Sequence, residues 1–283
     1  MSLLRHIKVC NAWEPTRFVP FLHGRARLGL VRRDNAERLS RFPKLFEVGK
    51  DAVRLVAPGN AKAIGAAIDR AVEELVAERV ISKWRNEFFA VAERWGGKVH
   101  FTLDRGAVPF FGVKAYGVHL NGYRRAGSKL KLWIGKRAFN KIVAPGKLDN
   151  LVAGGIGVAH GLEETLRKEA AEEAAMPKKL SSRAVAVGAI SYRMATQTGL
   201  RDDVLFLYDV ETPADFTPRN TDGELVSFAL MDADEMVARM RNTDDFKFNV
   251  NLVNIDFALR HGVIRPDDPE YLALVAGLHR PSD

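Results

Sequence analysis

The spacing of apolar residues predicts one long amphipathic helix in the first part of the chain, over residues 60–80. Its apolar positions are Ile64, Ile68, Val72, Leu75 and Val76. This period places them on one face of a helix. The side chain of Asn60 can accept a hydrogen bond from a free backbone N–H of the first turn, so we expect it to cap the helix. A shorter helix is expected from Asp34, which has Glu37 three residues later, to just before Pro43.

Alternating apolar and polar residues predict several short strands. The expected strands cover residues 26–31, 88–92, 100–103, 117–123 and 129–134. In the last of these, three aliphatic residues alternate with two lysines and Trp133, as in a strand with one solvated face. The elements before residue 113 therefore predict a small α/β unit over residues 1–112.

From about residue 113 onward the elements follow a different order. Strands are followed by a glycine-rich turn, a charged helix, two long strands and then helices. The segments 185–192 and 204–210 are rich in β-branched and aromatic residues and predict neighbouring antiparallel strands. Helices are expected over residues 232–241, 249–260 and 269–278. The second unit is therefore expected to be mixed α/β, over residues 113–283.

The composition excludes several classes of protein. The 283 residues are 47% hydrophobic and 28% charged, which supplies one large core or two modest ones and excludes a disordered or fibrous chain. The single cysteine, Cys10, cannot form an internal disulfide, and no apolar run approaches the roughly 20 residues of a membrane-spanning helix. The first ten residues lack the features of a signal peptide. We therefore expect a cytoplasmic protein without a membrane partner.

The net charge is +8, from 43 Lys and Arg against 35 Asp and Glu. A positive field attracts phosphorylated small molecules and nucleic acids alike. The densest basic segments, residues 25–33 and 129–141, alternate with apolar residues, as solvated strand faces do. The charge alone does not choose between these partners, but solvated strand faces give no specific indication of a nucleic acid. The sequence leaves the oligomeric state open.

Residues 151–177 carry the most distinctive chemistry. Glu169, Glu172 and Glu173 lie at positions i, i+3 and i+4 of a predicted helix, which places their carboxylates on one face. The other side of this helix carries the small residues Ala170, Ala171 and Ala174 and could lie close against a sheet. Grouped carboxylates repel one another unless a cation neutralises them. Carboxylate and water oxygens suit Mg²⁺ or Mn²⁺, whereas zinc prefers histidine or cysteine.

A solvated surface helix is the alternative interpretation, since Arg167 and Lys168 could form ion pairs with these acids. The glycines that precede the helix favour a functional site. At Gly154 and Gly155 the backbone amides can approach a phosphate closely, and further glycines lead the chain into the helix. A strand, a glycine-rich loop and a carboxylate helix in succession are the arrangement that diphosphate chemistry needs.

Residues 154–177 resemble the Nudix box. This motif is a glycine, five residues, a glutamate, seven residues and then R-E-U-x-E-E-x-G-U, where U is a bulky apolar residue. Residues 168–176 match its end as KEAAEEAAM. In this family the three glutamates of the motif hold the metal ion, so the resemblance assigns that role to Glu169, Glu172 and Glu173.

The chain departs from the Nudix box at three positions. Lys168 replaces the usual arginine, which keeps the charge but loses the bidentate fork that orients a carboxylate. The resemblance still implies a catalytic role for Lys168. Ala175 replaces the glycine that ends the helix, and His160 stands in place of the first glutamate. Glu163 or Glu164 could substitute for that missing acid.

The resemblance extends over nearly the full chain and specifies a subfamily. The supporting segments are residues 116–123, 132–134, 145–155, 208–209, 215–218, 222–225 and 255–262. They are similar to Nudix proteins with an additional N-terminal domain that are related to thiamine-pyrophosphokinase-like proteins. The resemblance implies an α+β fold, a Nudix α/β/α sandwich with a mixed sheet, preceded by a small α/β domain.

The resemblance also implies a reaction, the metal-dependent hydrolysis of an organic diphosphate, with Mg²⁺ or Mn²⁺ as cofactor. Glu224 stands where Nudix proteins often carry a further acid, and the resemblance gives it a catalytic role, either as general base or as an extra metal ligand. The subfamily implies thiamine diphosphate or its damaged analogues as substrate, cleaved to the monophosphate and phosphate. A cationic thiazolium ring favours aromatic faces, so Trp133 and Tyr208 are expected to bind it. Tyr192 and Asp209 are further candidates.

Two other functions stay open at this point. The same motif could act on a nucleoside diphosphate derivative such as ADP-ribose. The chain could also be a non-catalytic basic binding protein on a Nudix fold, for instance for RNA, which the three departures from the box would favour. The three retained glutamates argue against that second alternative.

Overall fold

The computed structural model describes residues 1–127 and 129–279. The helices are α1 (Leu4–Cys10), η1 (Pro15–Arg17), α2 (Arg33–Leu39), α3 (Ala61–Ala77), α4 (Val108–Phe111), α5 (Leu162–Ala174), α6 (Lys178–Ser181), α7 (Ala233–Asn242), α8 (Val250–Arg260) and α9 (Tyr271–Leu278). The strands are β1 (Phe18–His23), β2 (Ala26–Arg32), β3 (Phe46–Val48), β4 (Val53–Leu55), β5 (Phe88–Val91), β6 (Phe101–Asp104), β7 (Lys114–Ala126), β8 (Lys129–Arg137), β9 (Leu148–Asp149), β10 (Val152–Gly155), β11 (Val185–Ala195), β12 (Leu200–Glu211) and β13 (Leu225–Asp232). The helices and strands predicted from hydrophobic spacing are all present, with ends displaced by a few residues.

The N-terminal part contains a four-stranded sheet in the order β2-β1-β4-β3 and a separate β5–β6 hairpin. Helix α3 packs against β6 through the apolar face that the sequence predicts. The Asn60 Oδ1 atom accepts a hydrogen bond from the Ala63 N–H at 3.0 Å, which confirms the predicted cap. Phe21, Phe46 and Phe111 are in ring contact at the centre of the core.

A seven-stranded sheet forms the frame of the second part, with the order β11-β12-β7-β8-β13. Strand β10 pairs with β7, and β9 pairs with β8. The β12–β7 pair is parallel, whereas the other pairs are antiparallel, so the predicted mixed sheet is confirmed. β11 and β12 are antiparallel neighbours, as predicted.

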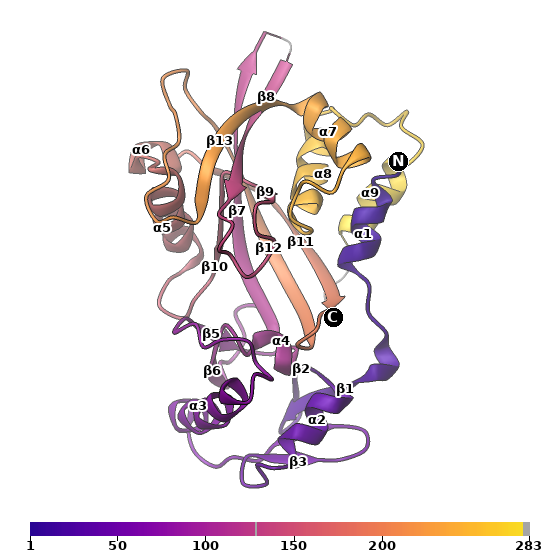
Figure 1. Ribbon diagram of the computed structural model, residues 1–283, viewed down its shortest axis with the longest axis vertical. Helices are drawn as coiled ribbons and strands as arrows, with labels where there is room; N and C mark the ends of the chain where they lie inside the picture. The colour runs from indigo at the N-terminus through magenta and orange to yellow at the C-terminus, as the bar shows by residue number, and fades with distance from the viewer. Residues whose placement is uncertain (128, 280–283) are drawn as a thin grey trace.

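Helices cover both faces of this sheet (Figure 1). On one face, Val118 and Leu120 of β7 pack in one cluster with Leu166 of α5. On the other face, Leu205 and Leu207 of β12 pack in a cluster with residues of α7, α8 and α9. Alternate strand residues thus enter two different cores, as the two-residue period of a strand requires. The expected α/β/α sandwich is confirmed.

The first helix lies apart from the rest of the N-terminal part. Leu3, Ile7 and Cys10 are buried in the cluster formed with α8 and α9, on the side of the sheet away from α5. Figure 1 shows α1 beside α9. The predicted boundary at residue 113 stays a prediction. Helix α1 precedes this boundary in sequence but packs against elements that follow it.

The two parts meet at one end of the long sheet, where β7 and β12 reach α4 and β2 (Figure 1). The Leu30 N–H donates to the Gly112 carbonyl at 3.1 Å. A Cβ on Gly112 would lie 2.0 Å from the Leu30 oxygen, so only glycine allows this approach. None of the described helices has the length and apolar character needed to cross a bilayer.

Candidate active site

The candidate site is built from β10, the loop after it and α5. Helix α5 lies against the sheet through Leu166, Ala170 and Ala174, whose small or apolar side chains are buried. Ala171, expected on the same side, is exposed instead, because it lies about 100° further around the helix than Ala170. The predicted smooth face is therefore formed by two of the three alanines.

The three carboxylates of α5 span the boundary between core and solvent. Glu173 is only 4% exposed, the Glu169 side chain is 18% exposed, and the Glu172 side chain is 46% exposed. Residues at i, i+3 and i+4 cover an arc of about 100° on a helix. They share one face, as predicted, but Glu173 lies at the edge of this face that meets the sheet and Glu172 lies at the edge that meets solvent.

Glu173 is held by the strand beneath it. Its Oε2 atom accepts a hydrogen bond from the Ala153 N–H of β10 at 2.7 Å. Burial raises the pKa of this carboxyl well above its ordinary value, and the Ala153 N–H offsets only part of that effect. The charges of Asp149, Glu169 and Glu224 raise the pKa further. Glu173 is thus a buried acid that a nearby cation would stabilise in its ionised form.

Glu169 lies directly over Gly154. A Cβ atom on Gly154 would come within 2.2 Å of Glu169 Cγ and 2.5 Å of its Cδ. Burial raises the pKa of Glu169, and Lys168 counteracts that rise. The glycine at the start of the motif therefore has a steric role, because it leaves space for the carboxylate on the strand surface.

Lys168 bridges two of these carboxylates. Its Nζ atom lies 2.7 Å from Glu172 Oε2 and 3.4 Å from Glu169 Oε1. The hydrogen bond with Glu172 raises the pKa of Lys168. Arg167 pairs with Glu163 at 3.2 Å. Arg167 and Lys168 therefore both form the ion pairs that the surface-helix interpretation expects. His160 Nδ1 lies 3.2 Å from Glu164 Oε1, so Glu163 and Glu164 face Arg167 and His160 rather than Lys168.

Glu224 comes close to the site from a different segment, the turn before β13. Gly223 adopts a left-handed φ of 80°, as a tight turn there requires. Glu224 Oε1 forms an ion pair with Lys141 Nζ at 2.6 Å. The charge of Glu224 contributes to the raised pKa values of both Glu169 and Glu173, after the larger effect of burial. The fold therefore brings the predicted fourth acid to the carboxylate side of α5.

The donor chemistry of this group suits a hard divalent cation. Glu169, Glu172 and Glu173 supply carboxylate oxygens, and the buried Glu173 has a single backbone N–H as its hydrogen-bond donor. Within residues 1–127 and 129–279, no three His, Cys, Asp or Glu side chains are already gathered closely enough to hold a metal ion. The ammonium of Lys168 instead neutralises Glu172 and Glu169. Metal binding would thus require Glu172 to turn away from Lys168.

The glycine-rich segment lies against the N-terminal part. Gly154 and Gly155 belong to β10, and a Cβ on Gly155 would lie 2.6 Å from the Phe89 ring of β5. The Val158 N–H donates to the Phe88 carbonyl at 2.9 Å. Phosphate binding by the two glycines stays a prediction, and their observed role is to permit close packing. Nothing in the local sequence pattern indicated this contact with β5.

The two predicted aromatic ligand residues lie in the core. Trp133 donates its indole N–H to Thr212 Oγ1 at 3.3 Å and packs beside Arg124. Trp133 is 8% exposed and belongs to the same buried cluster as Ala170 and Ala174 of α5. Binding of a substrate ring by Trp133 stays a prediction. Tyr208 shares the sheet face of α5 but is buried beneath it.

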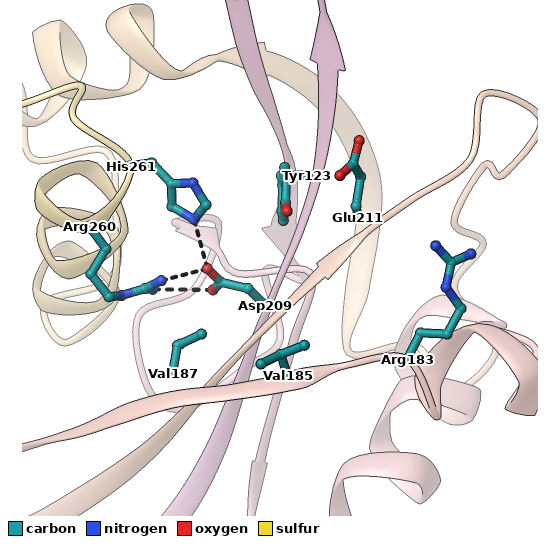
Figure 2. A pocket seen from close by; sticks show the side chains of 8 residues that line it. All are labelled: Tyr123, Arg183, Val185, Val187, Asp209, Glu211, Arg260 and His261. Carbon is teal, nitrogen blue, oxygen red and sulfur yellow. Dashed lines mark hydrogen bonds and ion pairs between the residues drawn. The ribbon is translucent and has the colours of Figure 1, made fainter.

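The cavity in Figure 2, of about 360 Å³, lies on the opposite face of the sheet. Arg260 and His261 point toward the Asp209 carboxylate in this view. Asp209 binds Arg260 at 2.6 Å, His261 at 2.8 Å and Asn121 at 3.0 Å. Burial alone would raise the pKa of Asp209, but these hydrogen bonds outweigh it and lower the pKa. Asp209 is thus fully engaged by the protein, and Tyr192 likewise bonds to Asp203.

Comparisons with known proteins cover both parts of the chain. A family profile described as a domain of unknown function (DUF4743) matches residues 2–115. Nudix hydrolase 20, chloroplastic, from Arabidopsis thaliana is 39% identical, and the match covers 91% of this chain and 71% of that protein. Nudix hydrolase 24, chloroplastic, from the same plant is 38% identical with the same coverage. A solved structure, DR0079 from Deinococcus radiodurans, is 18% identical with a TM-score of 0.45, covering 59% of this chain and 97% of that one.

Proposed function

The chain belongs to the Nudix hydrolase family, and on that basis we propose that it hydrolyses a small organic diphosphate with the help of Mg²⁺ or Mn²⁺. Nudix hydrolases act on diphosphate substrates, and family members generally use divalent metal ions. The observation that carries the proposal is the Glu173 carboxylate, which is buried beside Glu169 with one backbone donor. Ionising a buried carboxyl group costs free energy unless a cation lies beside it, and with a cation the ionised carboxylate can serve as a ligand.

Glu169, Glu172 and Glu173 would hold the metal. When bound, a divalent cation offsets the charge of the diphosphate oxygens and makes a bound water more acidic. The residues of this chain have separate tasks. Gly154 leaves room for Glu169, and Ala153 orients Glu173 through its N–H. Lys168 neutralises Glu172 and Glu169 until the metal takes its place beside Glu172.

Glu224 is the proposed general base. Its Oε1 atom is engaged by Lys141, so Oε2 would accept the proton of the attacking water. The water oxygen forms a bond to phosphorus, and the bond from that phosphorus to the bridging oxygen breaks. The products are an organic monophosphate and inorganic phosphate, so water supplies all the added atoms.

For the substrate we propose thiamine diphosphate or a damaged analogue of it. The resemblance to Nudix proteins with the extra N-terminal domain supports this choice, and the net charge of +8 favours an anionic ligand. The test is product analysis with thiamine diphosphate, oxidised thiamine diphosphate and ADP-ribose, each with and without Mg²⁺. Phosphate release from the thiamine compounds only with Mg²⁺ is the expected result. Turnover of ADP-ribose alone would overturn the thiamine assignment.

Two variants test the residue roles in the same assay. Glu172→Gln is expected to abolish metal-dependent phosphate release while leaving the fold intact, because Glu172 is exposed. Glu224→Gln is expected to lower kcat by about 100-fold, within the usual contribution of general base catalysis. Unchanged turnover in Glu172→Gln would refute the metal role. Salt-sensitive RNA binding without any turnover would favour a non-catalytic protein.

A further inference from the structure

An aromatic cluster lies where the two parts of the chain meet. Trp95, from the loop between β5 and β6, has its ring centroid 4.7 Å from Tyr116 of β7 and 4.8 Å from Phe206 of β12. Trp95 is 48% exposed, and Tyr116 and Phe206 are partly exposed. We call these three residues the junction aromatic cluster. An exposed tryptophan seated on two strand aromatics presents a flat apolar surface to solvent.

The junction aromatic cluster lies on the same sheet face as the carboxylates of α5. Phe206 pairs with Val118, and Val118 pairs with Gly154, over which Glu169 lies. These residues form one row across β12, β7 and β10. Two interstrand spacings separate Phe206 from Gly154, which is about 10 Å. A diphosphate at the carboxylates could therefore extend its organic group onto the aromatic surface.

A cavity of about 370 Å³ is lined by sequence neighbours of the junction aromatic cluster, although Trp95, Tyr116 and Phe206 are not themselves among its lining residues. Both parts of the chain line it, with Arg27, Glu93 and Arg94 from the N-terminal part and Lys114, Arg193 and Asp202 from the long sheet. Arg94 precedes Trp95 in the chain, and Lys114 precedes Tyr116 by two residues on the same face of β7. The volume lies in the range of pockets that hold small organic ligands.

The charges around this cavity indicate what it would accept. Asp202 is shared by Arg193 at 3.0 Å and Lys114 at 3.4 Å. Glu93, which also lines the cavity, accepts a hydrogen bond from the Arg27 backbone N–H at 3.1 Å, and the side chains of Arg27 and Arg94 add two further positive charges. The lining therefore has an excess of positive hydrogen-bond donors. Such a lining suits a neutral ring that carries acceptor nitrogens or oxygens, such as the aminopyrimidine ring of thiamine, rather than the cationic thiazolium ring.

We propose that the junction aromatic cluster and the cavity lined by Arg94 bind the organic group of the diphosphate substrate, a planar heteroaromatic ring that carries hydrogen-bond acceptors. Trp95 stacks on the ring, and Arg94 donates to its acceptors. This inference rests on the proposed function, because it takes the acids of α5 as the place of the diphosphate. It makes the N-terminal part a component of the substrate site.

The kinetic test compares Trp95→Leu with Trp95→Phe in the assay that releases phosphate from an organic diphosphate. Trp95→Leu is expected to raise KM at least about fivefold, with a smaller effect on kcat. Fivefold is about the smallest loss of affinity expected when one stacking contact between a ring and an aromatic side chain is removed. Trp95→Phe keeps an aromatic face and should stay within about twofold of the wild type. Trp84→Phe, at a partly buried tryptophan packed against the core of the N-terminal part, is the matched control.

Arg94→Gln provides a second test that does not depend on the folding of Trp95→Leu. It is expected to raise KM several-fold, whereas Arg70→Gln, on the exposed side of α3, should not. Wild-type KM values in both Trp95→Leu and Arg94→Gln would overturn the inference and leave the proposed function standing.

Binding without turnover separates the inference from the proposed function. Thiamine monophosphate carries an aminopyrimidine ring, and it should quench Trp95 fluorescence in the wild type but not in Trp95→Leu. Inorganic phosphate should quench neither protein. If the wild type hydrolyses no diphosphate in the panel, the proposed function fails, and this quenching still decides the inference. Equal quenching of both proteins, or none, would overturn it.

Discussion

Gly154→Ala is the sharpest perturbation of the candidate site, because it adds one methyl group beneath Glu169. The new Cβ would lie 2.2 Å from Glu169 Cγ, 2.5 Å from Cδ and 3.0 Å from Oε1. Gly154 is in a strand without a positive φ, so alanine can adopt its backbone conformation. The effect of the substitution therefore comes from displacement of the carboxylate and not from backbone strain.

The size of that displacement follows from the contact distance. Carbon atoms in van der Waals contact lie about 3.5–4.0 Å apart, so Glu169 Cγ must move at least about 1.3 Å from its present distance of 2.2 Å. A misplacement of about 1 Å can reduce a rate by about 100-fold. Overpacking of this kind costs about 1–3 kcal/mol of folding stability. We expect a folded enzyme with kcat reduced about 100-fold.

The assay is metal-dependent phosphate release from whichever organic diphosphate the wild type cleaves, together with urea unfolding. Gly161→Ala is the matched control, because nothing lies within 4 Å of its new Cβ and its φ is −73°. Gly161 caps α5, so alanine there costs about 1 kcal/mol of stability without displacing Glu169. Its kcat should stay within about twofold of the wild type, which separates loss of stability from loss of geometry.

A folded Gly154→Ala protein with a kcat within threefold of the wild type would rule out this steric role of Gly154. It would mean that catalysis does not need the Glu169 carboxylate at its position on β10. Glu169→Gln removes the charge without a steric change and should match the loss in Gly154→Ala. A large loss in Gly154→Ala with none in Glu169→Gln would assign the effect to the strand instead.

Three further predictions concern α5. Burial raises the pKa of Glu173 above 4.5, so the free energy of unfolding of the wild type should fall as the pH rises from 4.5 through the folded-state pKa. Glu173→Gln should therefore unfold at a higher urea concentration than the wild type at pH 8, and the difference should be smaller at pH 5. The same variant should lose over about 100-fold in kcat. Lys168→Met should lower kcat about tenfold but change unfolding free energy by under about 1 kcal/mol, since its ion pair with Glu172 is exposed. Ala175 has a φ of 50°, so Ala175→Gly should raise stability by about 0.5–1 kcal/mol in thermal unfolding.

Local patterns predicted most of the elements because they depend on neighbours in sequence. The helix over 61–77 and its Asn60 cap need only the spacing of apolar residues and one side chain next to the first turn. The pairing of β11 with β12 follows from two adjacent apolar runs and a polar turn. Helix α1 was not predicted, because its apolar residues are few and its packing partners lie near the other end of the chain.

The candidate site was predictable only in part for the same reason. The glutamates of α5 share one helix, so their spacing predicts a common face. How deeply each is buried depends on where the sheet lies, and only the structure shows Glu173 inside and Glu172 outside. Trp133 and Tyr208 match the resemblance in sequence, but strand register places them in the core. Trp95 carries no local signal except its position before two glycines.

Local sequence patterns are enough to predict the order of most helices and strands, the carboxylate motif and the family, because each depends on residues close together along the chain. Only the three-dimensional arrangement shows which acids are buried, that Gly154 makes room for Glu169, and that the N-terminal part contacts Gly155 and the long sheet. These contacts join residues far apart in the chain. They depend on strand order and register, which local hydrophobic patterns do not specify.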